Sequence, residues 1–340
     1  MSGSPLPLLF WPLQWNQTDM AEQTAAPSAA ACSAVIRREK TREVSGLDIL
    51  QNLINGISLG SVYAIIALGY TMVYGIAKML NFAHGDVIMV GAYICFYAVS
   101  KYQLPPLVGI LLAMAVCTVL GVVIERLAYK PLRQSASLAV LITAIGVSYF
   151  LQNAALLLWQ SDPKNFPTFL NGIFGDKGIT FLGRSITGTT VVTVLACVII
   201  MVALTAFTGM TKMGKAMRAC SEDKAAAQLM GIDVNRTISM TFAIGSALAA
   251  IAGVLLCSAY PQLTPTTGSL PGIKAFTAAV FGGIGSIPGA LLGGLLLGVI
   301  EIFAMTFSTE LSNAVVFAVL IIVLLVKPTG LLGKQIREKV

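Results

Sequence analysis

The sequence predicts an all-α polytopic membrane protein with about eight or nine transmembrane helices, including one broken or re-entrant segment. Of its 340 residues, 56% are hydrophobic and 11% are charged, and the mean hydropathy is +0.83. Soluble domains usually carry about 25% charged residues. The apolar runs have the length of roughly 20 residues that crosses a bilayer as a helix, and no run alternates as barrel strands do. Helices are therefore the expected spanning elements, since each pairs its own backbone groups.

Residues 1–46 are expected to form a disordered tail. They contain a Pro- and Trp-bearing start, an Ala/Ser-rich stretch and the charged run at 37–43. A signal peptide would place its basic region before its apolar one, and here the order is reversed. Translation could start at Met1 or at Met20. The remainder divides into a transmembrane domain at 47–333 and a short basic tail at 334–340.

Nine apolar segments follow the tail, and the seventh is short enough to be a half-length or re-entrant helix. They lie at 49–75, 82–100, 104–124, 138–159, 189–207, 238–258, 273–285, 288–307 and 312–326.

The basic residues lie between these segments rather than on one face with aromatic residues, which excludes a nucleic-acid interface. The positive-inside rule places the loops 125–137 and 208–237 and the carboxyl-terminal tail in the cytoplasm. Nine crossings would then put the basic residues of the amino-terminal tail outside, unless one segment is not a full crossing.

Small residues recur at four-residue spacing, which predicts close helix–helix packing, or else a face toward a partner subunit or a moving seam. The rows are Gly56, Gly60 and Ala64; Gly245, Ala249 and Gly253; Gly285, Gly289 and Gly293; and Ala290, Gly294 and Gly298.

The stretch NFAHGD at 81–86 holds the only histidine. On a continuous helix His84 and Asp86 would point about 200° apart, so they would not pair. The stretch therefore predicts a helix break, with Asn81 or Asp86 capping a helix that starts at Val87. A metal site is excluded because too few ligands are present. A proton relay through His84 and Asp86 remains an alternative.

No motif indicates an enzyme or a bound cofactor. The segment GMTKMGKA at 209–216 resembles a phosphate-binding loop, but Ala216 lacks the hydroxyl that would hold magnesium, and the segment follows an apolar span. HExxH, GxSxG and paired intramembrane carboxylates at helical spacing are absent from the sequence. A nucleophile with a matched base is therefore missing.

The polar segment 214–245 predicts a short cytoplasmic helix from Met217 to Met230, ended by Gly231, with Asp233 capping the next span. Such a helix suits docking against another protein, and the alternative is a solvated loop.

This segment resembles the coupling loop of permeases from branched-chain amino acid ABC importers of the Liv type. Ala225, Ala226 and Gly231 match the Glu-Ala-Ala…Gly motif, with the glutamate displaced to Glu222 and Arg218 one turn earlier. Three further stretches resemble the same family: NGISLGSVYAIIALGYTMVYGIAKMLNFAHGDVIMVGAY (55–93), GIKAFTAAVFGGIGSIPGALLGGLLLGVIE (272–301) and KPTGLLG (327–333). The chain most resembles the smaller, H-type subunit.

The resemblance implies a permease subunit in a bacterial inner membrane that imports leucine, isoleucine or valine by alternating access. Its implied partners are a second permease, either a paralogous M-type subunit or a second copy, two cytoplasmic ATPase subunits that hold ATP and magnesium, and a periplasmic binding protein. A urea or short-amide permease of the same family is the main alternative, and a proton-coupled transporter is a further one.

Polar residues within the spans are the candidates for lining the pathway or holding the helix break. Asp86 and Glu301 stand out, because ionisable residues inside a membrane are functional suspects. The full set is Asn55, Tyr63, Tyr70, Asn81, His84, Asp86 and Glu301, with Tyr74 and Asn153 as further candidates.

Overall fold

The computed structural model describes residues 46–167, 169, 179–181 and 184–333. Residues 1–45 of the tail predicted at 1–46, and with them Met20, lie outside the described residues, as does the predicted tail at 334–340; Gly46 is the first residue of α3. From Leu50 onward the described residues belong to one compact unit.

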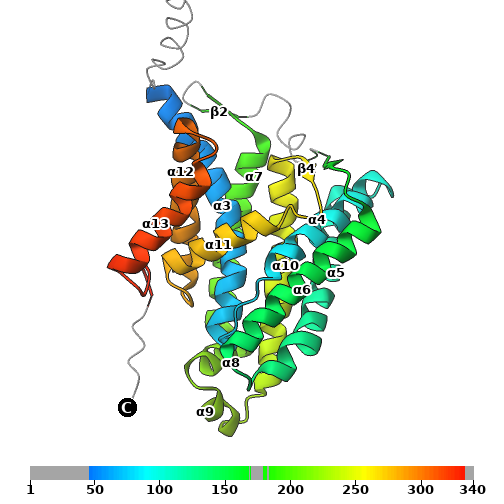
Figure 1. Cartoon of the computed structure of the whole chain (residues 1–340), viewed down its shortest axis with the longest axis vertical. Coiled ribbons are helices and arrows are strands. Elements are labelled where there is room, and N and C mark those ends of the chain that lie inside the picture. The colour runs from blue at the N-terminus through cyan, green and yellow to red at the C-terminus, as the bar shows by residue number, and fades with distance from the viewer. Residues whose placement is uncertain (1–45, 168, 170–178, 182–183, 334–340) are drawn as a thin grey trace, which may run out of the picture. The chain divides into compact units, whose positions relative to one another are not determined.

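Each of the nine predicted apolar segments coincides with an α-helix of the described part, which confirms the all-α membrane-protein fold (Figure 1). The helices are α3 Gly46–Ala77, α4 His84–Ser100, α5 Pro106–Ile124, α6 Ser137–Trp159, α7 Gly188–Met210, α10 Val234–Ala259, α11 Ser269–Gly282, α12 Ile287–Phe307 and α13 Ser312–Val326.

Length separates these helices into classes. Among the described residues, six helices are long and apolar enough to cross a membrane, and α4 and α13 are shorter apolar helices. The seventh segment, α11, has 14 residues. At 1.5 Å per residue it spans about 21 Å, less than the ~30 Å hydrocarbon core.

Short elements occupy the connections. A π-helical turn, η1 Glu125–Tyr129, and a 3-10 turn, η2 Lys130–Leu132, follow α5. Two helices, α8 Lys212–Glu222 and α9 Lys224–Leu229, lie between α7 and α10. Near the opposite end, β1 Lys164–Asn165 pairs antiparallel with β4 Gln262–Leu263, and β2 Ile179–Phe181 pairs with β3 Arg184–Ile186 (Figure 1).

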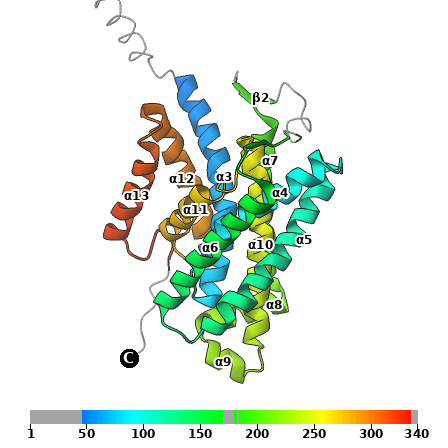
Figure 2. The same cartoon turned by 45° about the vertical axis from the view of Figure 1, so that its right-hand side comes forward.

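Helices α3 and α10 form the centre of the bundle, with α5 on one side and α12 and α13 on the other (Figure 2). In the most apolar 18-residue stretch of each helix, the buried share is 89% in α3 and 78% in α10. The corresponding share is 28% in α5 and 17% in α7. The outer helices therefore present apolar side chains outward, as lipid-facing helices do.

Two of the small-residue rows pack against each other. A Cβ atom added to Gly298 of α12 would lie 2.2 Å from the backbone nitrogen of Gly60 in α3, and one added to Gly294 would lie 2.5 Å from the Cα atom of Ala64. The α3 and α12 backbones thus touch directly, which only residues without large side chains permit.

The other rows also meet neighbours within this chain. A Cβ atom added to Gly253 of α10 would lie 2.3 Å from the carbonyl oxygen of Ile88 in α4, and one added to Gly293 of α12 would lie 2.2 Å from that of Ala278 in α11. Gly285, however, does not belong to a helical row. It lies in the α11–α12 turn with φ +96°, a conformation that favours glycine.

Candidate coupling site and pathway

The polar segment forms two helices, so the prediction of one helix from Met217 to Met230 is wrong. Helix α8 begins at Lys212, where the Thr211 hydroxyl accepts a hydrogen bond from the amide of Gly214. Asp223 ends α8 and caps α9, accepting from the amides of Ala225 at 2.8 Å and Ala226 at 3.1 Å. An aspartate directly before Lys-Ala-Ala-Ala is an N-cap signal, and it could have been read from the sequence.

The predicted end of this segment is confirmed. Gly231 follows α9 with φ +81°, the left-handed conformation in which glycine commonly terminates helices. Asp233 accepts a hydrogen bond from the amide of Arg236 at 3.0 Å and so caps α10.

Helix α9 presents small and apolar groups outward. Ala225 and Ala226 are exposed, whereas Ala227 is buried against the rest of the chain. Beyond them Leu229 and Met230 are 89% and 83% exposed. Large apolar side chains exposed beside a small-residue face are typical of a docking surface.

The two other predicted coupling residues differ in their surroundings. The guanidinium of Arg218 donates from Nε and Nη2 to the carbonyl oxygen of Thr208 at 3.0 and 2.9 Å, which ties α8 to the end of α7. Glu222 is exposed at the end of α8. Arg218 therefore stabilises the position of α8.

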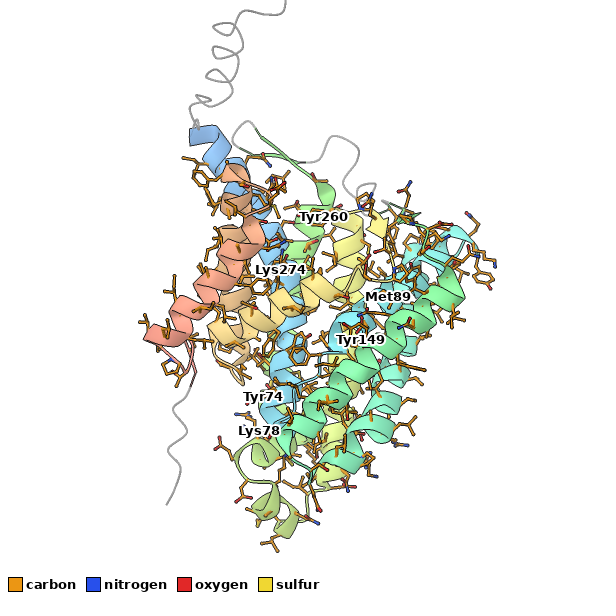
Figure 3. All side chains as sticks on the ribbon, in the orientation of Figure 1. Tyr74, Lys78, Met89, Tyr149, Tyr260 and Lys274 are labelled. Atoms are coloured by element: carbon orange, nitrogen blue, oxygen red, sulfur yellow. The ribbon has the colours of Figure 1, made fainter. Side chains whose placement is uncertain are left out.

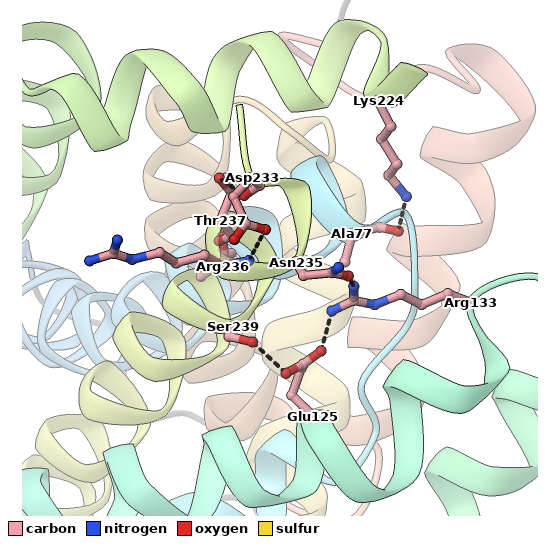
Figure 4. A network of polar contacts seen from close by, with 10 residues as sticks. Ala77, Glu125, Arg133, Lys224, Asp233, Asn235, Arg236, Thr237 and Ser239 are labelled. Carbon is pink, nitrogen blue, oxygen red and sulfur yellow. Dashed lines mark hydrogen bonds and ion pairs between the residues drawn. The ribbon is translucent and has the colours of Figure 1, made fainter. Parts of the chain in front are cut away.

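Lys224 connects α9 to the membrane-spanning bundle (Figure 4). Its Nζ donates a hydrogen bond of 2.7 Å to the carbonyl oxygen of Ala77, the last residue of α3. Burial, together with the neighbouring charges of Arg133 and Lys78, lowers the pKa of Lys224 below that of an exposed lysine.

A second polar network fixes the α5–α6 connection to the first turns of α10 (Figure 4). Arg133 donates to Glu125 and to Asn235, and the Ser239 hydroxyl donates to the other carboxylate oxygen of Glu125 at 2.6 Å. The Glu125 side chain is fully buried, and both its oxygens are satisfied. This network was not predicted from the sequence. A glutamate, Glu125, at the start of a basic loop does indicate that it pairs with one of the loop's basic residues.

The predicted helix break is present, but it begins and ends elsewhere than expected. Helix α3 stops at Ala77, and Lys78 follows with φ +57°. Helix α4 starts at His84 rather than Val87, and no side chain caps it. The expected cap by Asn81 or Asp86 is therefore wrong.

Both of these side chains bind other helices instead. Asn81 accepts a hydrogen bond of 2.9 Å from the Tyr129 hydroxyl, and Asp86 accepts one of 3.0 Å from the amide of Gln152 in α6. The same amide lies 3.2 Å from the Ser148 hydroxyl and 3.3 Å from that of Ser269 in α11. The amide of Gln152 thus links Asp86 of α4 to α6 and α11.

His84 is buried apart from this cluster. Its ring centroid lies 4.6 Å from that of Tyr70, and a Cβ atom added to Gly69 would lie 2.6 Å from its Nε2. Gly69 makes room for the imidazole. The histidine and Asp86 form no hydrogen bond or ion pair with each other in the described structure, so a direct proton couple has no support in the geometry.

Three of the predicted pathway residues, Tyr70, Tyr74 and Asn81, line a pocket together with Phe276. The pocket is small, with a water-accessible volume of about 10 Å³, close to what one water molecule needs, and it lies between α3, the α3–α4 connection and α11. Tyr74 lies toward the end of the bundle that carries Lys78 (Figure 3). The walls are mostly apolar, so the pocket fits an apolar group better than a charged one.

The remaining candidates divide by burial. Asn55 and Asn153 are exposed, and each forms a side-chain hydrogen bond along its own helix, with Gln51 and with the carbonyl oxygen of Tyr149. Tyr63 and Glu301 are buried, and Glu301 pairs with Lys274 of α11 at 2.6 Å. Lys274 was not among the predicted residues, although a lysine within an apolar segment indicates a functional position.

Comparisons with known proteins identify the family of this chain. A family model described as branched-chain amino acid transport system / permease component matches residues 52–324. The high-affinity branched-chain amino acid transport system permease protein BraD of Pseudomonas aeruginosa is 48% identical, covering 86% of this chain and 98% of its own. LivH of Escherichia coli K12, named in the same way, is 46% identical with the same coverage. A probable LivH of Methanocaldococcus jannaschii is 30% identical over 82% of this chain and 90% of its own. The chain therefore belongs to the family of permease components of branched-chain amino acid transport systems.

Proposed function

We propose that this chain is the permease subunit of an ATP-binding cassette importer that moves leucine, isoleucine and valine into the cytoplasm across a bacterial inner membrane. The observation that carries the proposal is the α8–α9 pair. It exposes Ala225, Ala226, Leu229 and Met230 to a partner and is tied to the core helix α3 through Lys224.

Energy is supplied by other chains. Two ATPase subunits bind ATP and magnesium and receive the α8–α9 pair in their clefts. The segment 209–216 resembles a phosphate-binding loop in sequence, but it forms the end of α7 and the first turn of α8. This supports the assignment of ATP hydrolysis to other chains. A Cβ atom added to Gly214 would lie 2.2 Å from the carbonyl oxygen of Phe207, so no space for a phosphate exists there.

Two further partners complete the transporter. A second permease, paralogous or identical, contributes the other half of the pathway, and a periplasmic binding protein delivers the substrate. The exposed apolar faces of α5, α6, α7 and α13 are shared between lipid and this second permease.

The mechanism is alternating access driven from the cytoplasmic end. When ATP binding closes the ATPase pair, the α8–α9 pair moves with it. Lys224 transmits the movement to α3, and the network of Arg133, Glu125 and Asn235 transmits it from α10 to the α5–α6 connection. The pathway then opens outward.

The pocket at Tyr70, Tyr74 and Phe276 has mostly apolar walls, and in this conformation it is smaller than an amino-acid side chain. An apolar pocket distinguishes two ligands that differ by one methylene group by only about 1–3 kcal/mol of binding free energy. Most of the selectivity among apolar amino acids therefore rests with the binding protein.

Uptake into vesicles that contain this chain with its partner subunits and binding protein tests the proposal. ATP-dependent uptake of radiolabelled leucine is expected, with little uptake of urea. ATP-dependent uptake of urea without leucine would assign the chain to amide transport. Leucine uptake that survives ATP depletion and collapses with the proton gradient would overturn the ATPase-driven mechanism.

A further inference from the structure

A buried ion pair lies inside the bundle, away from the coupling helices. The ammonium of Lys274 in α11 is 2.6 Å from a carboxylate oxygen of Glu301 in α12. The two residues are 6% and 1% exposed. Figure 3 places Lys274 near Tyr260 and far from Lys78, which marks the end of the bundle that carries α8 and α9.

Stability does not account for these two charges. Removing two charged groups from water costs several kcal/mol for each ion, and apolar residues of similar volume often stabilise a protein as well or better. The neighbouring stretch of α12 packs without charge, through glycine, alanine and one leucine, Leu297. An ionisable pair retained inside an apolar bundle therefore indicates a function.

The hydrogen-bonding capacity of the pair is not filled. The second carboxylate oxygen of Glu301, Oε2, is buried and has no hydrogen-bond partner among the described residues. The Lys274 ammonium has three donors, and its one hydrogen bond within the described part of the chain goes to Oε1 of Glu301. The Tyr63 hydroxyl of α3 approaches the same carboxylate without satisfying Oε2.

Two tyrosines, Tyr63 and Tyr260, lie near the carboxylate of Glu301. Tyr260, at the end of α10, lies within electrostatic range of Glu301 and is 49% exposed. Tyr63, on the other hand, is buried. The pair thus lies below a half-exposed tyrosine in the half of the bundle that faces away from α8 and α9.

We propose that Lys274 and Glu301 form a binding site for the charged groups of a zwitterionic α-amino acid, an assignment that rests on the proposed import of amino acids. The ligand carboxylate binds the Lys274 ammonium, and the ligand ammonium binds Glu301, including its free Oε2. Because the pair and the zwitterion are each neutral overall, their union leaves no net charge inside the bundle.

The first test is competition binding to the wild-type complex in nanodiscs, without the binding protein. Radiolabelled leucine is bound, and unlabelled leucine, leucinamide or 4-methylpentanamide competes. Leucine should displace the label, whereas leucinamide, which lacks the carboxylate, and 4-methylpentanamide, which lacks both charges, should be at least about tenfold weaker. Equal displacement by 4-methylpentanamide, or no leucine binding by the wild type, would overturn the site.

The second test uses the neutral double variant Lys274→Met/Glu301→Met and the isosteric Glu301→Gln. Both should fold and co-purify with the ATPases in wild-type yield, while leucine binding and uptake fall by about tenfold or more. If the single variant Lys274→Met is inactive but the double variant recovers uptake, the pair has only a packing role and the proposal fails. Failure of the wild-type complex to import leucine would instead refute the proposed function, and the site with it.

Discussion

The side-chain ammonium of Lys224 in α9 donates a hydrogen bond of 2.7 Å to the carbonyl oxygen of Ala77, the residue that ends α3. A positive charge at a helix carboxyl terminus also interacts favourably with the helix dipole. One side chain therefore connects the exposed coupling helices to the most buried helix of the bundle.

Replacing Lys224 with Met should uncouple ATP hydrolysis from transport. Loss of a hydrogen bond from a charged donor costs about 1.5–3 kcal/mol, so the contact between α9 and α3 should weaken while the spans remain folded. We expect leucine uptake to fall several-fold with ATPase activity retained, measured together in proteoliposomes. Lys215, exposed on α8, provides the matched control Lys215→Met. Equal effects of the two variants would contradict a specific role for Lys224.

Gly231→Val should abolish ATP-driven uptake, because a β-branched residue strongly disfavours the φ of +81° that ends α9. Gly231→Asn is the matched variant and should retain most activity, since asparagine tolerates this conformation. Co-purification of the ATPase subunits checks whether the loss arises at the docking step.

Ala226→Asp should also abolish ATP-driven uptake, but by weakening the docking of the ATPase subunits directly. Ala226 is exposed on α9, so the substitution adds charge to the docking surface without disturbing the fold of the chain. If either Gly231→Val or Ala226→Asp co-purifies with the ATPase and transports normally, α8 and α9 are not the coupling element.

Asp86→Leu should impair folding or transport, whereas His84→Gln should largely preserve transport. Asp86 binds Gln152 and so joins α4 to α6, while His84 mainly fills space beside Gly69 and Tyr70. Gln152→Leu should reproduce the Asp86→Leu effect, because it removes the other half of the hydrogen bond. Uptake and the yield of folded protein in detergent are the measurements. The opposite ranking of the first two variants would restore the proton relay.

Gly60→Ala should strongly reduce the yield of folded protein, because its Cβ atom would lie 2.8 Å from the backbone of Leu295 in α12. Alanine otherwise favours a helix over glycine by about 1 kcal/mol, so a loss of stability must come from the helix contact. Gly146→Ala in α6 is the control, since no atom lies within 4 Å of the added group. Thermal denaturation in detergent should show a lower midpoint for Gly60→Ala only, and equal midpoints would contradict direct contact between α3 and α12.

The spans and the helix ends at Gly231 and Asp233 were predictable because they depend on local sequence. Apolar length located each of the nine helices, and Gly231 and Asp233 act through their own backbone neighbourhood. The division of α8 from α9 was also available locally, in the capping aspartate Asp223.

Partners across the bundle were not predictable in the same way. Asn81 and Asp86 could satisfy a nearby helix end, but Tyr129 and Gln152 offer stronger partners from distant helices. The pairing of Lys274 with Glu301 requires α11 and α12 to pack side by side, and the meeting of the α3 and α12 rows depends on the whole bundle. A sequence pattern indicates that such residues need partners, and the tertiary fold selects them.

The most direct test of the central claim is reconstitution by omission. Leucine uptake is measured in proteoliposomes that contain this chain alone, this chain with the second permease, or the full set with ATPase subunits, binding protein and ATP. We predict uptake only with the full set and only with hydrolysable ATP. Uptake by this chain alone under an imposed proton gradient would contradict the account.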